Sequence, residues 1–188
     1  MALNLVTLAE YKAYAELNST NNDSVINILI PNVSQLVKNY CRRTFVDYVD
    51  TPKIEIFRGG VPYIMLEENP IITITSLELS IDYGQTYTPL VEFTDWVLDG
   101  NQIFPLTSTE FPKYLRGYKV TYTGGFDDVP DDIKLAVMDL ITYYRKNEAS
   151  VKALKHVNTN SMQIEYLSDA ALPSHIKRIL DMYISDYV

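Results

Sequence analysis

The segment from Gly117 to Lys146 (GYKVTYTGGFDDVPDDIKLAVMDLITYYRK) constrains the fold more than any other part of the sequence. Val120 and Tyr122 alternate with polar residues, which is the period of a half-buried strand. Gly124 and Gly125 follow, and glycine permits the positive φ angles that a sharp reversal needs. The sequence therefore predicts a strand that ends in a tight turn.

An acidic turn leads from the two glycines into an amphipathic helix. Asp127 and Asp128 precede Pro130, and Asp131 and Asp132 follow it. Carboxylates are stabilising at the positive N-terminal end of a helix, and proline is accepted in the first turn because no hydrogen bond is lost there. Apolar residues then recur at helical spacing, which predicts a face packed on a core. This stripe consists of Ile133, Ala136, Val137, Leu140, Ile141 and Tyr144.

The four aspartates around Pro130 are also the best candidate site for a hard cation, which binds several converging carboxylate oxygens. Their spacing does not match a calcium loop, which needs acidic or amide residues at alternate positions, a central glycine and a late glutamate. Helix capping explains the same residues without a metal. We therefore predict no bound metal and a structural role for the turn and helix start. That element comprises Gly124, Gly125, Asp127, Asp128 and Pro130.

Two further helices are predicted near the N-terminus. Thr7 and Glu10 have the spacing of a capping box, which indicates a short helix after Thr7. Asp23 opens a second helix with apolar residues along one face. Pro31 lies inside this helix, where it removes a hydrogen bond and clashes one turn back. Because the apolar face keeps its phase across Pro31, we expect a kink rather than two helices.

Residues 52–123 change to the period of two that is typical of strands. The clearest hairpin runs from Trp96 to Phe104, with Asp99-Gly100 suited to a type I′ turn. The loops around Gly59-Gly60, Asp82–Gln85 and Thr107–Leu115 are the expected contacts with other proteins. The block predicts an antiparallel sheet inserted between helices.

The C-terminal helix begins after Pro173-Ser174 and has an apolar stripe along its whole length. The stripe consists of Ile176, Ile179, Leu180, Tyr183, Ile184 and Tyr187. One interpretation is that it completes the core with the other helices. The other is that it docks into a groove of a neighbouring protein. Residue spacing leaves both open.

The expected fold class is therefore α+β, with an α-helical bundle core and an inserted antiparallel β-sheet. We expect a single domain over residues 1–188, because its length and its 47% content of apolar residues suit one core. Within it, residues 1–50 carry the N-terminal helices, 52–123 the β region and 130–188 the C-terminal helices.

The charge of the chain excludes most nucleic-acid-binding classes. The net charge is −8, and a protein that grips DNA by its phosphates needs a positive surface. An acidic wall around passing DNA remains compatible, since repulsion prevents adhesion. No stretch approaches the roughly 18 apolar residues of a membrane span, and the first residues lack the pattern of a secretion signal.

Residues with catalytic or ligand-binding chemistry do not cluster in the sequence. His156 and His175 have no ligand partner at helical spacing, and Cys41 lies at the end of an apolar stripe without a nearby base. We expect no enzymatic activity and no cofactor. The 15 tyrosines favour large subunit contacts, where a side chain with one apolar and one polar end is suited.

The order of several segments resembles the tailed-phage head–tail connector (neck adaptor) family. The strand with its Gly124-Gly125 turn and the acidic helix start match at the C-terminal half. At the N-terminal half, Leu5–Lys12 and the helix from Asp23 into Tyr40–Arg43 match as well. Pro70–Leu77 is similar to the central strand of the family.

This resemblance implies a structural virion protein in the neck, made and assembled in the host cytoplasm. It implies a homo-oligomeric ring, usually of twelve copies, that sits on the portal protein and docks the next neck or tail-completion protein. Double-stranded DNA passes through the lumen without specific binding. The resemblance also implies that the C-terminal stripe from Ile176 to Tyr187 contacts the portal. Two alternatives stay open: another head-completion or tail-completion ring protein, and a small acidic α+β hydrolase that uses the cluster from Asp127 to Asp132.

Overall fold

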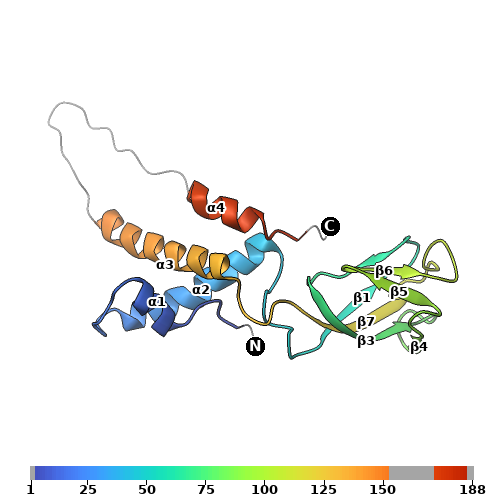
Figure 1. Cartoon of the computed structure of the whole chain (residues 1–188). Helices are drawn as coiled ribbons and strands as arrows, with labels where there is room; N and C mark the ends of the chain where they lie inside the picture. The colour runs from blue at the N-terminus through green and yellow to red at the C-terminus, as the bar shows by residue number, and fades with distance from the viewer. Residues whose placement is uncertain (1–2, 153–171, 186–188) are drawn as a thin grey trace. The chain divides into compact units, whose positions relative to one another are not determined.

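The computed structural model describes residues 3–152 and 172–185, which divide into two compact units (Figure 1). The β unit comprises Lys38–Pro130 together with Leu3, Ile184 and Ser185. The helical unit comprises Asn4–Val37 and the described residues from Asp131 to Tyr183. The predicted α+β class is confirmed. The expectation of one domain over the whole chain stays a prediction.

The β unit contains two antiparallel sheets (Figure 1). The first has the order β1-β7-β3-β4 and the second the order β2-β6-β5. The strands of the first sheet are β1 (Lys53–Phe57), β7 (Tyr118–Gly124), β3 (Ile71–Leu79) and β4 (Thr88–Leu90). Those of the second are β2 (Ile64–Met65), β6 (Gln102–Pro105) and β5 (Trp96–Asp99).

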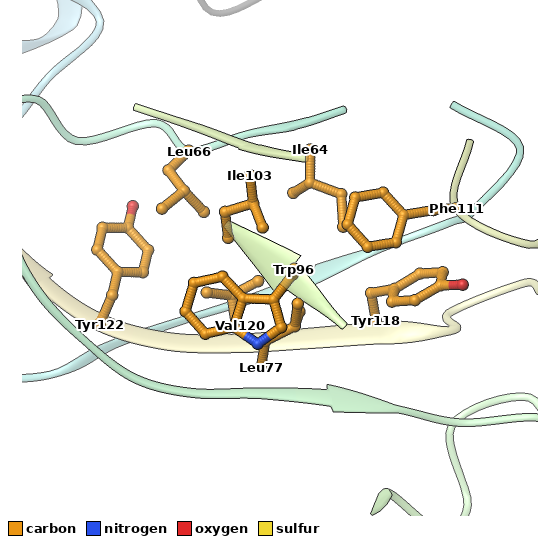
Figure 2. Packing of buried hydrophobic residues seen from close by; sticks show 9 residues of the cluster. All are labelled: Ile64, Leu66, Leu77, Trp96, Ile103, Phe111, Tyr118, Val120 and Tyr122. Atoms are coloured by element: carbon orange, nitrogen blue, oxygen red, sulfur yellow. The ribbon is translucent and has the colours of Figure 1, made fainter. Parts of the chain in front are cut away.

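The core of the β unit follows from the alternation predicted for β7. Tyr118, Val120 and Tyr122 are buried on one face of this strand, and Leu77 of β3 lies directly opposite Val120. Figure 2 shows the three β7 side chains among buried residues of the second sheet and of the neighbouring loops. These neighbours are Ile64, Leu66, Trp96, Ile103 and Phe111. Each fully buried apolar side chain contributes about 1.5–3 kcal/mol, so this cluster holds the two sheets together.

The β5–β6 hairpin is present, but its turn differs from the predicted type I′. Asp99 pairs with Gln102 in the strand register, so Gly100 and Asn101 are the two central turn residues. Gly100 has φ of 62°, whereas Asn101 is not in the left-handed region, which is the pattern of a type II′ turn. The turn is therefore centred one residue later than predicted, on Gly100-Asn101 instead of Asp99-Gly100.

The two glycines after β7 have different roles. Gly125 has φ of 113°, as the sequence predicts, and a Cβ there would lie 2.2 Å from the carbonyl oxygen of Phe45. Gly124 is instead the last residue of β7, and its φ is not positive. A Cβ on Gly124 would lie 3.1 Å from the carbonyl oxygen of Pro70, so glycine allows a close approach of two backbones there.

Within the residues that the structure describes, four helices belong wholly or mainly to the helical unit (Figure 1). They are α1 (Leu8–Tyr14), α2 (Asp23–Cys41), α3 (Asp131–Lys152) and α4 (Ser174–Asp181). Thr7 and Glu10 form the predicted capping box of α1. Helix α2 continues through Pro31 as one element, so the chain does not form two separate helices here. The last residues of α2, from Lys38, belong to the β unit.

The helical unit has its own core along the predicted stripes. Ile26 and Val33 of α2 and Leu140 of α3 are buried. Tyr11 of α1 is buried too, and its hydroxyl lies 3.1 Å from Oγ1 of Thr142 on α3. Helices α3 and α4 pack against each other. None of the helices in the described ranges is long and apolar enough to cross a membrane.

Candidate interaction surfaces

The three loops predicted to contact other proteins meet at one end of the β unit. The amide of Gly59 donates to the carbonyl oxygen of Tyr114 at 3.0 Å, and that of Gly60 to Phe111 at 2.6 Å. The amide of Ser80, at the start of the β3–β4 loop, donates to the carbonyl oxygen of Gly117 at 2.7 Å. Residues that are 37 to 55 positions apart in the sequence are thus hydrogen-bonded to each other in one surface.

The β3–β4 loop is held from within by the carboxylate of Asp82. This carboxylate accepts hydrogen bonds from the hydroxyls of Ser80 and Thr86, each at 2.6 Å. It also accepts from the backbone amides of Gln85 and Thr86, at 3.1 and 2.9 Å. These hydrogen bonds, led by that from Ser80, lower the pKa of Asp82 well below its ordinary value, so the clamp stays ionised. The loop is pre-organised.

The same loop presents large apolar side chains to solvent. Ile81 and Tyr83 flank Asp82, and both are 70% exposed. Tyr83 has φ of 63°, a conformation that bulky residues rarely adopt. Backbone strain of this kind occurs where the surrounding structure enforces it, often at binding sites. Here the hydrogen bonds of Asp82 enforce it.

A second exposed aromatic lies in the β4–β5 loop, and sequence reasoning missed it. Phe93 is 76% exposed and has φ of 59°. Its amide donates to the carbonyl oxygen of Trp96 at 2.8 Å. Asp95 closes the loop, because its Oδ2 accepts from the amide of Val91 at 2.8 Å. The available signal was an aromatic residue between polar neighbours, three positions ahead of Trp96, the buried first residue of β5.

The C-terminal stripe is divided between buried and exposed positions. Ile176 and Leu180 are buried in the helical unit, and Ile179 is half-buried. The hydroxyl of Tyr183 donates to the carboxylate of Asp132 at 2.8 Å. Ile184 is exposed, whereas Tyr187 lies outside the described residues. Contact of this stripe with a portal stays a prediction.

Helix α3 begins at Asp131, and the structural role of the turn and helix start stays a prediction. Pro130 directly precedes α3, and Asp131 and Asp132 lie in its first turn. Asp127 and Asp128 are exposed in the turn before it. Among residues 3–152 and 172–185, no group of three or more His, Cys, Asp or Glu side chains is arranged to hold a metal ion.

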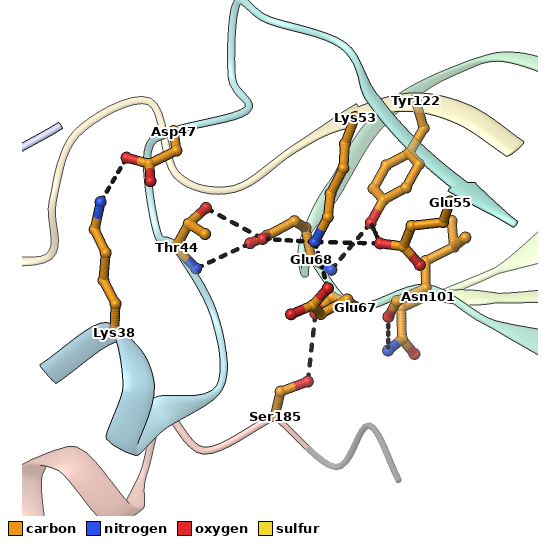
Figure 3. A network of polar contacts seen from close by, with 11 residues as sticks. Lys38, Thr44, Asp47, Lys53, Glu55, Glu67, Glu68, Asn101, Tyr122 and Ser185 are labelled. Atoms are coloured by element: carbon orange, nitrogen blue, oxygen red, sulfur yellow. Dashed lines mark hydrogen bonds and ion pairs between the residues drawn. The ribbon is translucent and has the colours of Figure 1, made fainter. Parts of the chain in front are cut away.

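A buried polar network supports the sheet from the opposite end (Figure 3). Nζ of Lys53 on β1 lies 3.2, 2.6 and 3.1 Å from carboxylate oxygens of Glu55, Glu67 and Glu68. Burial alone would lower the pKa of Lys53, but the hydrogen bond with Glu67 and the charges of Glu68 and Glu55 outweigh burial and raise it. Glu68 also accepts from the backbone amide and the hydroxyl of Thr44, at 3.2 and 3.1 Å.

Residues near both ends of the chain also belong to the β unit, and Figure 3 shows the ion pair of Lys38 with Asp47 beside them. Nζ of Lys38, in the last turn of α2, lies 2.5 Å from the carboxylate of Asp47 and donates to the carbonyl oxygen of Leu3 at 2.8 Å. The amide of Ser185 donates to the carbonyl oxygen of Cys41 at 2.9 Å. Buried Ser185 is thus fixed to the end of α2.

Comparison with known proteins gives a consistent family and fold. The model of a family described as head completion protein matches residues 4–185. A chain from the neck of an empty gene transfer agent (GTA) particle, computed with C6 symmetry, has a TM-score of 0.62 and 16% identity. The match covers 98% of this chain and 91% of that chain.

Two other solved structures are similar at the level of the fold. A chain of the neck of a native GTA particle, computed with C12 symmetry, has a TM-score of 0.60 and 17% identity, with 100% of this chain and 97% of that chain covered. A chain of the virion of a native GTA particle has a TM-score of 0.62 and 14% identity, with 98% and 91% covered. No curated protein matches the sequence significantly.

Proposed function

This chain belongs to the head completion protein family, and from that premise we propose that it is a structural neck protein of a tailed phage or a related particle. It forms a ring on the portal, extends the DNA channel and docks the next head-completion or tail component. The observation that carries this proposal is the fold match over almost the whole chain to components of virion necks. In this proposal the chain is a virion neck component that acts by binding other proteins and not by catalysis.

A ring of twelve copies is the proposed assembly. One of the similar neck structures was computed with C12 symmetry and another with C6 symmetry, and both symmetries are compatible with twelve positions. A closed ring needs one contact that repeats from each copy to the next. The portal supplies the matching template. The net charge of −8 keeps the passing DNA from adhering to the wall.

The pre-organised loops of the β unit suit a binding function. Asp82 and Asp95 hold their loops in one conformation before any partner arrives. Little ordering entropy is then lost on binding, and exposed aromatic side chains such as Tyr83 and Phe93 are common anchors of interfaces.

The proposed portal contact uses the C-terminal region. Ile176 and Leu180 are buried in the core of the helical unit and cannot contact a partner. Exposed residues near them are therefore the better candidates for the portal contact. Met182, the residue after α4, is 69% exposed, and Ile184 is exposed as well. We assign the portal-facing surface to these positions, with Tyr187 beyond them.

The test is co-sedimentation of the purified chain with purified portal of the particle that encodes it. We expect co-sedimentation, and electron microscopy should show a ring of density on the portal with twelve repeats. If the chain stays in the supernatant, or binds a different neck component but never the portal, the protein belongs to another ring of the head–tail junction. Hydrolytic activity that is lost on replacing Asp127, Asp128, Asp131 and Asp132 by alanine would overturn the structural role.

A further inference from the structure

The four-stranded sheet has two edges with different exposed residues. Its order, β1-β7-β3-β4, places β1 at one edge and β4 at the other (Figure 1). Each neighbouring pair is antiparallel, so β1 and β4 run in opposite directions. A contact that closes a ring joins one surface of each copy to a different surface of the next, and the two edges are different surfaces.

The β4 edge, which we define as Ile81, Tyr83, Val91 and Phe93, carries large side chains on two fixed loops. All four side chains are exposed, and both aromatic residues have positive φ. The loops on either side of β4 are each closed by an aspartate, Asp82 or Asp95. Two independent loops thus share one construction, in which a carboxylate holds the backbone and an aromatic ring projects outward.

Strand β4 itself is unsuited to extending the sheet. Its central residue is Pro89, which has no amide hydrogen to donate to an added strand. The strand is also only three residues long. A protein that contacts this edge therefore binds through the side chains of the flanking loops.

The β1 edge, which we define as Ile54 and Ile56, is apolar where solvent-facing strands are usually polar. The side chains are 62% and 43% exposed and lie opposite Thr121 and Lys119 of β7. The residues that alternate with the two isoleucines face inward, and Lys53, which lies between the carboxylates of the buried network, is one of them. An outward face of an antiparallel sheet alternates polar residues with the core, so two adjacent outward isoleucines indicate a covered surface.

We propose that copies of this chain associate head to tail, with the β4 edge of one copy against the β1 edge of the next. The inference rests on the ring of the proposed function and names the contact that closes it. A cyclic ring needs two different surfaces on each copy, and here projecting aromatic loops would meet a flat strand. Charge also fits, because the β4 loops carry Asp82, Glu92 and Asp95, whereas exposed Arg58 directly follows β1.

The size of these edges suits an assembly that forms on a template. A stable pair of proteins buries roughly 800 Å² on each partner. Six exposed side chains supply only a part of such an area. Free copies then associate weakly through this contact, and the portal brings them together before the ring closes.

The test joins the two edges covalently in assembled particles. Ile54→Cys and Phe93→Cys are introduced together into the full chain, and particles that contain it are treated with a short bismaleimide. Native Cys41 is buried and contributes little background. We expect a ladder of dimers, trimers and larger species from the double variant, and monomers from each single variant. A chain with Ile54→Cys and Asp99→Cys, where Asp99 is exposed in the β5–β6 turn, should form no ladder.

Other results would overturn the contact. Dimers from the Phe93→Cys variant alone would mean that like edges meet. Particles that contain the double variant but show no ladder would refute the contact and leave the proposed function intact. Thiol labelling of the single variants gives a second readout, because both substituted positions should lose labelling on passing from the free chain to the particle. Equal labelling of either position in both states would also overturn the proposal.

Discussion

The hydroxyl of Tyr122 donates a hydrogen bond to Oε1 of Glu55 at 2.5 Å, in the buried part of the sheet (Figure 3). The same hydroxyl accepts from the backbone amide of Glu68 at 3.2 Å. Oε2 of Glu55 is buried and has no hydrogen-bond partner among the described residues. Burial therefore raises the pKa of Glu55, although the hydrogen bond from Tyr122 and the charge of Lys53 oppose the increase.

This raised pKa predicts a pH dependence of stability. Between the ordinary pKa of 4.5 and the higher folded value, the folded state binds more protons than the unfolded state. The contribution of Glu55 to the free energy of unfolding thus falls as pH rises through that window. We expect Glu55→Gln to reduce this fall, which urea unfolding at a series of pH values above 4.5 would measure. Glu92→Gln, at an exposed position, is the control. Identical profiles for Glu55→Gln and the wild type would contradict the expectation.

Lys53 is expected to be the most sensitive member of the polar network. Lys53→Met removes the cation that lies within 3.2 Å of three carboxylates. Removing one partner of a buried ion pair costs about 3–5 kcal/mol, because the remaining charge is left uncompensated. Lys53→Arg keeps the charge and should lose less. Chemical denaturation measures both, and equal losses in the two variants would show that shape and not charge matters at this position.

Gly125 and Gly100 form a matched pair of substitution sites. Both have positive φ, but a Cβ on Gly125 would lie 2.2 Å from the carbonyl oxygen of Phe45, whereas a Cβ on Gly100 meets nothing within 4 Å. Gly100→Ala should lower the free energy of unfolding by about 1–2 kcal/mol, the cost of a left-handed backbone. Gly125→Ala should cost clearly more, because the backbone near Phe45 has to move. Similar losses for the two variants would rule out a role for that close approach.

Local patterns in the sequence were sufficient to predict the helices and strands, but not to predict which of them pack or pair with each other. The alternation along Val120 and Tyr122 and the stripe from Ile133 depend on neighbouring residues, so the strand and the helix were predictable. The pairing of β7 with both β1 and β3 joins segments that are far apart, and no local signal specifies it. In the same way, the stripe of α4 was visible, whereas the core that covers Ile176 and Leu180 was not.

The interaction surfaces were predictable only in part. Turn-forming residues identified the loop that contains Asp82, but the outward position of Tyr83 depends on hydrogen bonds within the folded loop. Phe93 lies between polar residues in the sequence, but its left-handed backbone is fixed in the fold by the hydrogen bond with Trp96 and by the loop closure at Asp95. A φ angle set by tertiary contacts leaves no pattern in the residue order.

Asp82→Ala is expected to loosen the β3–β4 loop without unfolding the protein. The amides of Gln85 and Thr86 lose their acceptor, so their hydrogen exchange should become faster. The lowered pKa of Asp82 means that the loop stays ordered at pH values near 3.8 and loses order as pH falls further. Hydrogen exchange measured by mass spectrometry would test both points. Asp99→Ala, in another exposed turn, should leave these amides unchanged.

The C-terminal helix offers a test that separates packing from portal binding. Leu180 is fully buried and Met182, two residues later, is 69% exposed. Leu180→Ala should lower the free energy of unfolding by about 2–5 kcal/mol, as for other buried leucines. Met182→Asp should change it by no more than about 0.5 kcal/mol, the usual range for surface positions, but should abolish co-sedimentation with the portal. If Met182→Asp still binds the portal as the wild type does, the portal-facing surface lies elsewhere on the chain.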